Sequence, residues 1–483
     1  MGKFMLASLV LVSLFITACN DGTNKPSDQL SPFEGRWQAT AYGQVIDYHD
    51  EIASFYEFTS SYCILTRKVE ISDEELREEG WELSDDNSEL REKAAFSDTD
   101  IRGSVFDRVD DLPDSCRTNL VARFGDDNYQ DNPELNFEIF WQTFHEYYLS
   151  FDVKEVDWQA QYEIFRPEVT AGTTGEELFE VLSAMVEPLM DNHVEIASEY
   201  GDVDFSNHMT TIDLLTEEFV NANGEVDTEE KHQQYVKYVV SQIELMDEVR
   251  LSYAVDEGGV EFAANDEVIW YLAPDNIGVL IIDSMIGFST DNEDDIEAEA
   301  ELMVLDEAIT QALTTLQDTD GLIIDVRNNS GGFDAASQLI VKHFLDTERR
   351  LYCKQARLGS GRTELEAYHL SPAENARYLK DIVLLTSRNT TSAAEVFTLM
   401  MRNLPNVTTI GEPTQGSLSD SLEKTLPNGF SFALSNEFYL SPEGEWFEHV
   451  GLPVDEQIPY GTLDQRKNEE DLALEAAYFM LTN

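Results

Sequence analysis

Short apolar runs alternate with helical patterns through the second half of the chain, and no other feature constrains the fold as strongly. The runs, each too short for a helix and bounded by polar turn formers, are residues 277–282, 321–326, 382–385 and 407–410. Helical patterns follow the first three runs, at residues 297–316, at residues 335–345 and from Ser392 onward. This alternation predicts an α/β domain around a largely parallel, buried sheet.

The turn after the run 321–326 holds paired glycines immediately before a helix. Gly331 and Gly332 allow the backbone to approach a ligand closely and offer N–H groups to an anion. Neither of the common glycine-rich nucleotide motifs, GxxxxGKS/T or GxGxxG, is present, so a nucleotide site is not indicated. An oxyanion hole and a plain tight turn both remain open at this point.

Ser392 and His193 stand where a nucleophile and a base could stand. Ser392 is at the first turn of the helix after the run 382–385, where free backbone N–H groups stabilise an anion. Serine is also a common helix cap, so a structural role is the alternative. His193 lies between a helical segment and an apparent strand, flanked by Asp191 and Asn192, and there too a structural histidine is the alternative.

Five motifs occur in one order along the chain and together resemble a known family. They are DNHV at 191–194, DVRNNSGG at 325–332, TSAAE at 391–395, GEPTQG at 411–416 and EHVGLPVD at 448–455. The combination looks like the C-terminal-processing (tail-specific) serine peptidase family, over about residues 133–200 and 275–460. The resemblance implies a crotonase/ClpP-like α/β catalytic core with Ser392 as nucleophile and with no metal or organic cofactor.

The residue that serves as general base separates two branches of this family. In the tail-specific branch a catalytic Lys follows the Gly that matches Gly416, whereas Ser417 stands there in this chain. The departure points to the tricorn-like branch, in which the resemblance implies His193 as base and Glu448 as its support. Asn192 stands where that branch often carries Ser, and its amide can still hydrogen-bond.

The chemistry of such a site requires further groups. A serine hydroxyl becomes a useful nucleophile when a neutral imidazole takes its proton, and the imidazole in turn needs an acceptor such as Glu448. The tetrahedral intermediate needs two hydrogen-bond donors for its oxyanion. We expect these to be the N–H of Ala393, at the helix start, and an N–H of Gly331 or Gly332.

The N-terminus predicts export and a lipid anchor. Lys3 precedes an apolar run at residues 4–16, and Ile-Thr-Ala-Cys ends it at Cys19. Small residues before a cysteine, after such a run, resemble a bacterial lipobox, so Cys19 is predicted to be lipidated. An ordinary signal peptide or a short membrane anchor is the alternative. The expected location is the cell envelope, on a membrane facing the periplasm or on the outer membrane.

Composition and texture divide the rest of the chain. The predicted parts are a signal peptide at 1–19, a polar tether at 20–32, a β-rich domain at 33–130, a helical segment of the peptidase unit at 131–200, an acidic, mostly helical connector at 201–270 and the α/β core at 271–483. An exported chain can form disulfides, and Cys63–Cys116 is the expected pair. The formal net charge of −64 argues against a nucleic-acid partner.

These observations predict a lipid-anchored serine endopeptidase that acts on proteins or peptides through a Ser/His/Glu acyl-enzyme mechanism. A catalytically inactive, peptidase-like binding protein is the alternative. A crotonase-type acyl enzyme would share the core, but no basic residues for an acyl-CoA are recognisable. The oligomeric state and the natural substrate do not follow from the sequence.

Overall fold

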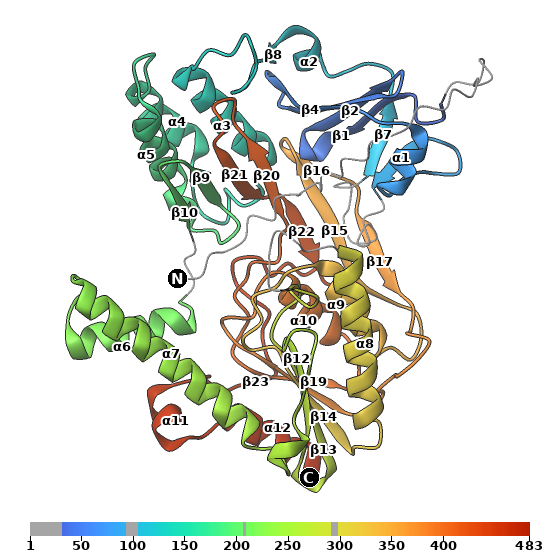
Figure 1. Ribbon diagram of the computed structural model, residues 1–483, viewed down its shortest axis with the longest axis vertical. Helices are drawn as coiled ribbons and strands as arrows, with labels where there is room; N and C mark the ends of the chain where they lie inside the picture. Colours follow the sequence, from blue (N-terminus) through green and yellow to red (C-terminus); the bar gives the residue numbers. More distant parts are fainter. Residues whose placement is uncertain (1–30, 93–104, 206–208, 291–297) are drawn as a thin grey trace, which may run out of the picture.

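The computed structural model describes residues 31–92, 105–205, 209–290 and 298–483. Cys19, the predicted signal peptide and most of the predicted tether lie outside the described residues. Among the helices that are described, none is both long enough and apolar enough to cross a membrane. Figure 1 shows a β-rich part at one end of the molecule and a helix-covered sheet at the other, with strands of the C-terminal half between them.

An eight-stranded sheet forms the N-terminal part. In spatial order its strands are β5 (Trp81–Leu83), β6 (Glu89–Glu92), β7 (Val105–Val109), β1 (Gly35–Ala39), β2 (Gln44–His49), β3 (Ile52–Phe58), β4 (Cys63–Glu70) and β8 (Leu120–Val121). The short helices α1 (Asp73–Glu78) and α2 (Asp114–Thr118) lie beside it. The predicted disulfide Cys63–Cys116 is present and joins β4 to α2.

Three helices follow this sheet: α3 (Pro133–Tyr147), α4 (Trp158–Phe165) and α5 (Gly175–Val186). Their apolar residues and those of the N-terminal sheet form one buried cluster. In α3 these residues recur at helical spacing, so one face of the helix is apolar. Each begins with a side-chain cap, and in α5 Thr174 and Glu177 form a capping box.

A small sheet then connects this helical segment to the C-terminal half. Its strands, in spatial order, are β10 (Gly201–Asp204), β9 (Glu195–Ser198), β21 (Ser431–Ser435) and β20 (Ser421–Thr425). Ile196 of β9 lies opposite Phe432 of β21, and the two strands run antiparallel. The pairing therefore brings the residues just before β9 next to a part of the chain more than 200 residues later.

A seven-stranded sheet forms the centre of the other end. In spatial order its strands are β11 (Glu261–Ala263), β12 (Val268–Ala273), β13 (Ile277–Ile282), β14 (Gly321–Asp325), β18 (Ile382–Thr386), β19 (Val407–Gly411) and β23 (Glu456–Gln457). From β13 to β23 all neighbours are parallel. The predicted parallel sheet is confirmed, and the carboxyl ends of β14 and β18 lie level, with Asp325 opposite Leu385.

Helices cover both faces of this sheet. On one face lie α8 (Ala298–Leu316), α9 (Asp334–Lys342) and α10 (Ala393–Met401), and on the other α12 (Leu472–Thr482). Every residue of β14 and β18 is buried, which explains why these strands are continuous apolar runs. In sheets of this kind a functional site is expected in the loops at the carboxyl ends of the strands.

The segment predicted as a mostly helical connector at 201–270 is only partly helical. Helices α6 (Thr211–Asn223) and α7 (Glu229–Leu251) are present, but β11 and β12 extend the core sheet antiparallel to β13. The prediction is wrong for this stretch because residues 268–271 (Val-Ile-Trp-Tyr) are β-branched or aromatic and all four are buried. The sheet thus begins at Glu261 rather than at residue 271.

A fourth sheet lies between the two ends of the molecule. It comprises β16 (Gly361–Arg362), β15 (Arg349–Leu358), β17 (Glu366–Leu370) and β22 (Glu437–Leu440). Tyr42 of the N-terminal part donates its hydroxyl to Glu437 of β22, and Glu437 forms an ion pair with the buried Lys354 of β15 at 2.6 Å. The remaining helix, α11 (Leu463–Asn468), precedes α12.

Candidate active site

Ser392 lies between β18 and α10 in a backbone conformation that few residues with a side chain adopt. Its φ is 53° and its ψ is −127°, and such strain typically costs about 1–3 kcal/mol. The Ser392 N–H donates to the carbonyl of Ser417 at 3.0 Å, which holds the turn. The side chain makes no capping hydrogen bond and is partly exposed. Its hydroxyl is therefore available for chemistry, and the helix-cap interpretation does not apply.

The paired glycines pack against Ser392 and supply one candidate oxyanion donor. A Cβ on Gly331, whose φ is +97°, would lie 2.7 Å from the Ser392 Cβ, so this position requires glycine. The N–H of Gly331 is already engaged by Asn329 Oδ1 at 2.9 Å. The N–H groups of Gly332 and Ala393 make no hydrogen bond within the described residues. Of the two predicted glycine donors, Gly332 is thus the one with an available N–H.

Two buried carboxylates fix the loop at residues 414–419, which runs beside Ser392. Glu395 of α10 accepts the backbone N–H groups of residues 416 and 417 at 2.7 and 2.6 Å. Glu448 Oε2 accepts the next two, of residues 418 and 419, at 2.8 and 2.9 Å. Because this loop also accepts the Ser392 N–H, it ties the serine to Glu448.

His193 lies in the tight turn between a 3-10 helix (Glu187–Leu189) and β9. Asp191 holds this turn, since its Oδ1 accepts the His193 N–H at 3.0 Å. Asp191 also accepts hydrogen bonds from the hydroxyl groups of Tyr148 at 2.9 Å and Ser435 at 3.0 Å. The aspartate is 1% exposed. The turn that carries His193 is therefore held by Asp191, and Asp191 is itself hydrogen-bonded to residues from two other parts of the chain.

The structure brings the predicted base and its predicted support together. One side-chain ligand atom from each of Asp191, His193 and Glu448 lies within 4.8 Å of the other two. Their hydrogen bonds are not closed: His193 Nδ1 and Glu448 Oε1 are buried and have no hydrogen-bond partner among the described residues. Among the described residues no hydrogen bond joins Ser392 to His193. The hydrogen bonds that link the serine to the cluster run through the loop 414–419.

The titration behaviour of this cluster follows from its burial. Burial lowers the pKa of His193 below its usual value, against the opposing pull of Asp191 and Asp420, and this favours a neutral imidazole. Burial raises the pKa of Glu448 well above its usual range, and the neighbouring carboxylates Asp191 and Glu395 add to this. Burial also acts to raise the pKa of Asp191. The imidazoles of His449 and His193 and the hydrogen bond from the His193 N–H outweigh burial, so the pKa of Asp191 is lowered.

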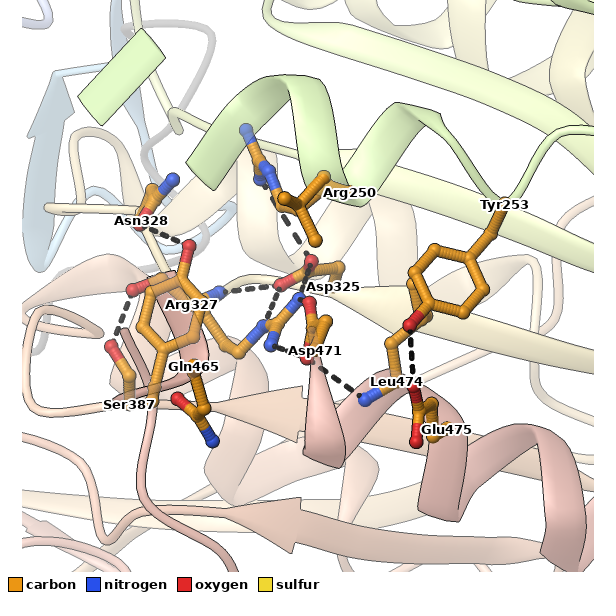
Figure 2. A network of polar contacts seen from close by, with 12 residues as sticks. Arg250, Tyr253, Asp325, Arg327, Asn328, Ser387, Gln465, Asp471, Leu474 and Glu475 are labelled. Carbon is orange, nitrogen blue, oxygen red and sulfur yellow. Dashed lines mark hydrogen bonds and ion pairs between the residues drawn. The ribbon is translucent and has the colours of Figure 1, made fainter. Parts of the chain in front are cut away.

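A buried ion network stands behind the glycine turn (Figure 2). Arg327, which directly precedes the turn and is fully buried, donates to Asp325 at 2.9 and 2.7 Å and to Asp471 at 2.8 and 2.7 Å. Arg250 of α7 donates to Asp283 and lies 3.8 Å from Asp325. The network joins α7 and the start of α12 to the end of β14, so it fixes the point from which the glycine turn begins.

Two other candidate residues contribute nothing visible to the cluster. Asn192 makes no side-chain hydrogen bond with the described residues, so its supporting role stays a prediction. Lys424, already set aside on sequence grounds, lies on β20 with Nζ 3.7 Å from Glu57 of the N-terminal sheet. It is therefore directed toward the other end of the molecule.

Sequence reasoning missed the two carboxylates that organise the site. Asp191 and Glu395 both stand inside the quoted motifs, but no role was assigned to either. The signal that could have found them is position: an aspartate two residues before a histidine can accept its N–H in a turn. A glutamate in the first turn of an otherwise apolar helix must be buried and therefore needs several donors.

Comparisons with known proteins relate this chain to a family of peptidases. The model of "Peptidase family S41" matches residues 276–458, and that of "Tricorn protease C1 domain" matches residues 129–187. The carboxy-terminal processing protease CtpA of Bacillus subtilis (strain 168) is 25% identical over 173 residues, which cover 34% of this chain and 36% of that protein. The carboxyl-terminal-processing protease of Picosynechococcus sp. is 28% identical over 169 residues, covering 34% and 39%. The matched part thus spans less than half the length of these relatives.

A solved structure shares the fold over a larger part of the chain. The crystal structure of a putative peptidase from Parabacteroides merdae superposes with a TM-score of 0.56 at 23% identity, covering 73% of this chain and 98% of the other. The predicted fold class, an α/β core of this kind preceded by a helical segment and a β-rich N-terminal part, is confirmed.

Proposed function

Because the chain belongs to peptidase family S41, we propose that it is a serine endopeptidase that hydrolyses proteins or peptides with Ser392 as nucleophile and His193 as base. The observation that carries this proposal is the strained, uncapped Ser392 beside two available N–H groups. The loop 414–419 connects that serine to the buried cluster that contains His193.

Acylation uses the groups in the following way. His193 takes the proton of the Ser392 hydroxyl while Oγ bonds to the carbonyl carbon of the scissile peptide, and the carbonyl electrons move to its oxygen. The resulting oxyanion accepts hydrogen bonds from the N–H groups of Gly332 and Ala393. Collapse breaks the C–N bond, and His193 passes its proton to the departing amine. Loss of one oxyanion donor typically costs about 3–4 kcal/mol of transition-state stabilisation.

Deacylation repeats the proton transfers with water. His193 takes a proton from water, the hydroxide adds to the ester carbon, and Ser392 leaves and regains its proton. The imidazolium that exists in both halves of the cycle is stabilised by the ionised Asp191 and by Glu448, which loses its own proton more readily beside a cation. All charges in the cycle are balanced by these side chains.

The hydrogen bond between Ser392 and His193 must form for this mechanism to run. Catalytic hydrogen bonds are often long in the absence of substrate and shorten in the Michaelis complex. A bound peptide would exclude water from the partly exposed serine. We therefore assign closure of the Ser392–His193 contact to substrate binding.

An inactive, peptidase-like binding protein is the second candidate, because the contacts from His193 to Ser392 and to Glu448 are open. Labelling of the full chain by a fluorophosphonate, with Ser392→Ala as control, distinguishes the two. Labelling that Ser392→Ala abolishes, together with hydrolysis of an unfolded protein, supports the enzyme. A wild-type chain that stays unlabelled and cleaves nothing refutes it and favours the binding protein.

The proposed setting is the bacterial cell envelope, with the chain anchored through a lipid on Cys19. The apolar run and the lipobox-like residues before Cys19 support this. In cells fed a fatty-acid analogue, the wild-type chain should be labelled and should fractionate with membranes. A Cys19→Ala chain that is labelled equally would overturn the assignment.

A further inference from the structure

The cluster of Asp191, His193 and Glu448 has the donor set and the burial of a metal site. One potential ligand atom of each residue lies within 4.8 Å of the other two. Asp191 and Glu448 are 1% and 2% exposed, so two carboxylates are buried beside one imidazole. Buried polar atoms are nearly always hydrogen-bonded, yet Glu448 Oε1 and His193 Nδ1 have no hydrogen-bond partner in the described part of the chain. Two buried atoms without a partner, on two residues of one cluster, point to a ligand.

The chemistry of these groups selects the ligand. One imidazole nitrogen and two carboxylate oxygens are a common set for Zn²⁺, which binds such atoms at about 2.0–2.2 Å and leaves a fourth position open. Ligand atoms in a tetrahedral site of that size lie about 3.4 Å apart. The longest separation in the cluster, 4.8 Å at most, would have to shrink by about 1.4 Å when the ion binds.

The surroundings already orient these ligands, as the surroundings of bound metals do. Asp191 accepts hydrogen bonds from the hydroxyl groups of Tyr148 and Ser435. Glu448 uses only Oε2 for the N–H groups of the loop 414–419, so Oε1 is left for another partner. His449 Nε2 lies 3.9 Å from Asp191 Oδ2 and adds a second imidazole at the edge of the cluster.

We propose that Asp191, His193 and Glu448 bind one Zn²⁺ ion, and that the bound ion inhibits the enzyme. Binding needs only the three side chains. The inhibition rests on the proposed function, because a metal bond occupies an imidazole lone pair and displaces the ring from the orientation in which it can take the Ser392 proton. Removal of the ion restores the base, so the inhibition is reversible.

Binding is tested in the full chain carrying Ser392→Ala, which separates it from catalysis. Isothermal titration with Zn²⁺ is run in excess Mg²⁺, since a chain of net charge −64 collects cations loosely on its surface. We expect one tight site, weakened at least tenfold by His193→Ala and by the isosteric Glu448→Gln, and unchanged by His369→Ala, which removes an exposed histidine on β17. Thermal melting confirms that each variant is folded. Equal affinity in His193→Ala or in Glu448→Gln overturns the site.

Inhibition is tested separately in the wild-type chain. Stoichiometric Zn²⁺ should suppress fluorophosphonate labelling of Ser392 at least tenfold, and a chelator should restore it. Tight binding with unchanged labelling would overturn the inhibitory role while leaving the site in place. A wild-type chain that is never labelled, with or without chelator, refutes the proposed peptidase function and leaves the calorimetric result to stand on its own.

Discussion

Replacing Gly331 by alanine tests whether the glycine turn sets the position of the nucleophile. The new Cβ would lie 2.7 Å from the Ser392 Cβ and 2.9 Å from the Thr391 carbonyl oxygen, whereas ordinary contacts begin near 3.4 Å. The backbone around Ser392 must therefore shift by about 0.7 Å, the difference between these two separations. Misplacement of a reacting group by about 1 Å costs about 10²-fold in rate.

The chain offers a matched control for the backbone strain that this substitution also introduces. Gly429, in the turn between β20 and β21, has a φ of +93°, close to the +97° of Gly331, but a Cβ there would meet nothing within 4 Å. Both alanine variants should lose about 1–2 kcal/mol of stability from backbone strain, because both force a side chain into the left-handed region, and Gly331→Ala should lose about 1–3 kcal/mol more from the overlap of its Cβ with Ser392. Only Gly331→Ala should also lose activity.

The assay combines thermal melting with fluorophosphonate labelling and with hydrolysis of an unfolded protein. We expect labelling of Gly331→Ala to be about 10²-fold slower than that of Gly429→Ala when both are assayed well below their melting temperatures. Labelling rates of the two variants within threefold of each other would refute the reasoning. That result would mean that the contact between the glycine turn and Ser392 does not limit the reaction.

Three further substitutions probe the groups that surround the site. Asp471→Asn removes half of the carboxylate pairing of the fully buried Arg327, and chemical denaturation should show a loss of about 3 kcal/mol. Burial raises the pKa of Glu395 from 4.5 to about 7, so the native state holds a proton that the unfolded chain releases. Stability should therefore fall as the pH rises between these values, by about 3 kcal/mol, and melting curves of Glu395→Gln should show a smaller decline. Asp191→Asn should lower kcat about 10²-fold with little change in KM, because it removes the negative charge that stabilises the His193 imidazolium in the proposed mechanism; unchanged kcat would contradict that role.

The core of the fold was predictable because its signal is local. The buried strands β13, β14 and β18 are mostly apolar runs with polar or glycine-rich ends, and β19 is β-branched at four of its five positions, so each run specifies a strand without reference to distant residues. The strands β11 and β12 were missed for the opposite reason. They follow a long helix and belong to the core sheet only through their antiparallel pairing with β13.

The sequence nominated candidate site residues one by one, but it could not give their geometry. Motif order located Ser392, His193 and Glu448, and the structure brings the last two into one buried cluster. Which glycine has an available N–H could not be read from the sequence, because it depends on the side chain of Asn329. The unpaired atoms of the cluster could not be read from the sequence either, because they depend on the packing of segments that lie far apart in the chain.

The replacement of the family's lysine by Ser417 and the buried histidine cluster are connected through one loop. Residue 417 sits where its carbonyl oxygen accepts the Ser392 N–H, so a long side chain there would start beside the nucleophile and could serve it directly. With serine at this position the proposed base is His193, and the pairing of β9 with β21 brings its turn to this part of the molecule. Glu395 and Glu448 hold successive N–H groups of the same loop, so a displacement of the loop moves nucleophile and base support together. The two halves of the site are therefore aligned by backbone hydrogen bonds, which persist whether or not the Ser392–His193 contact is closed.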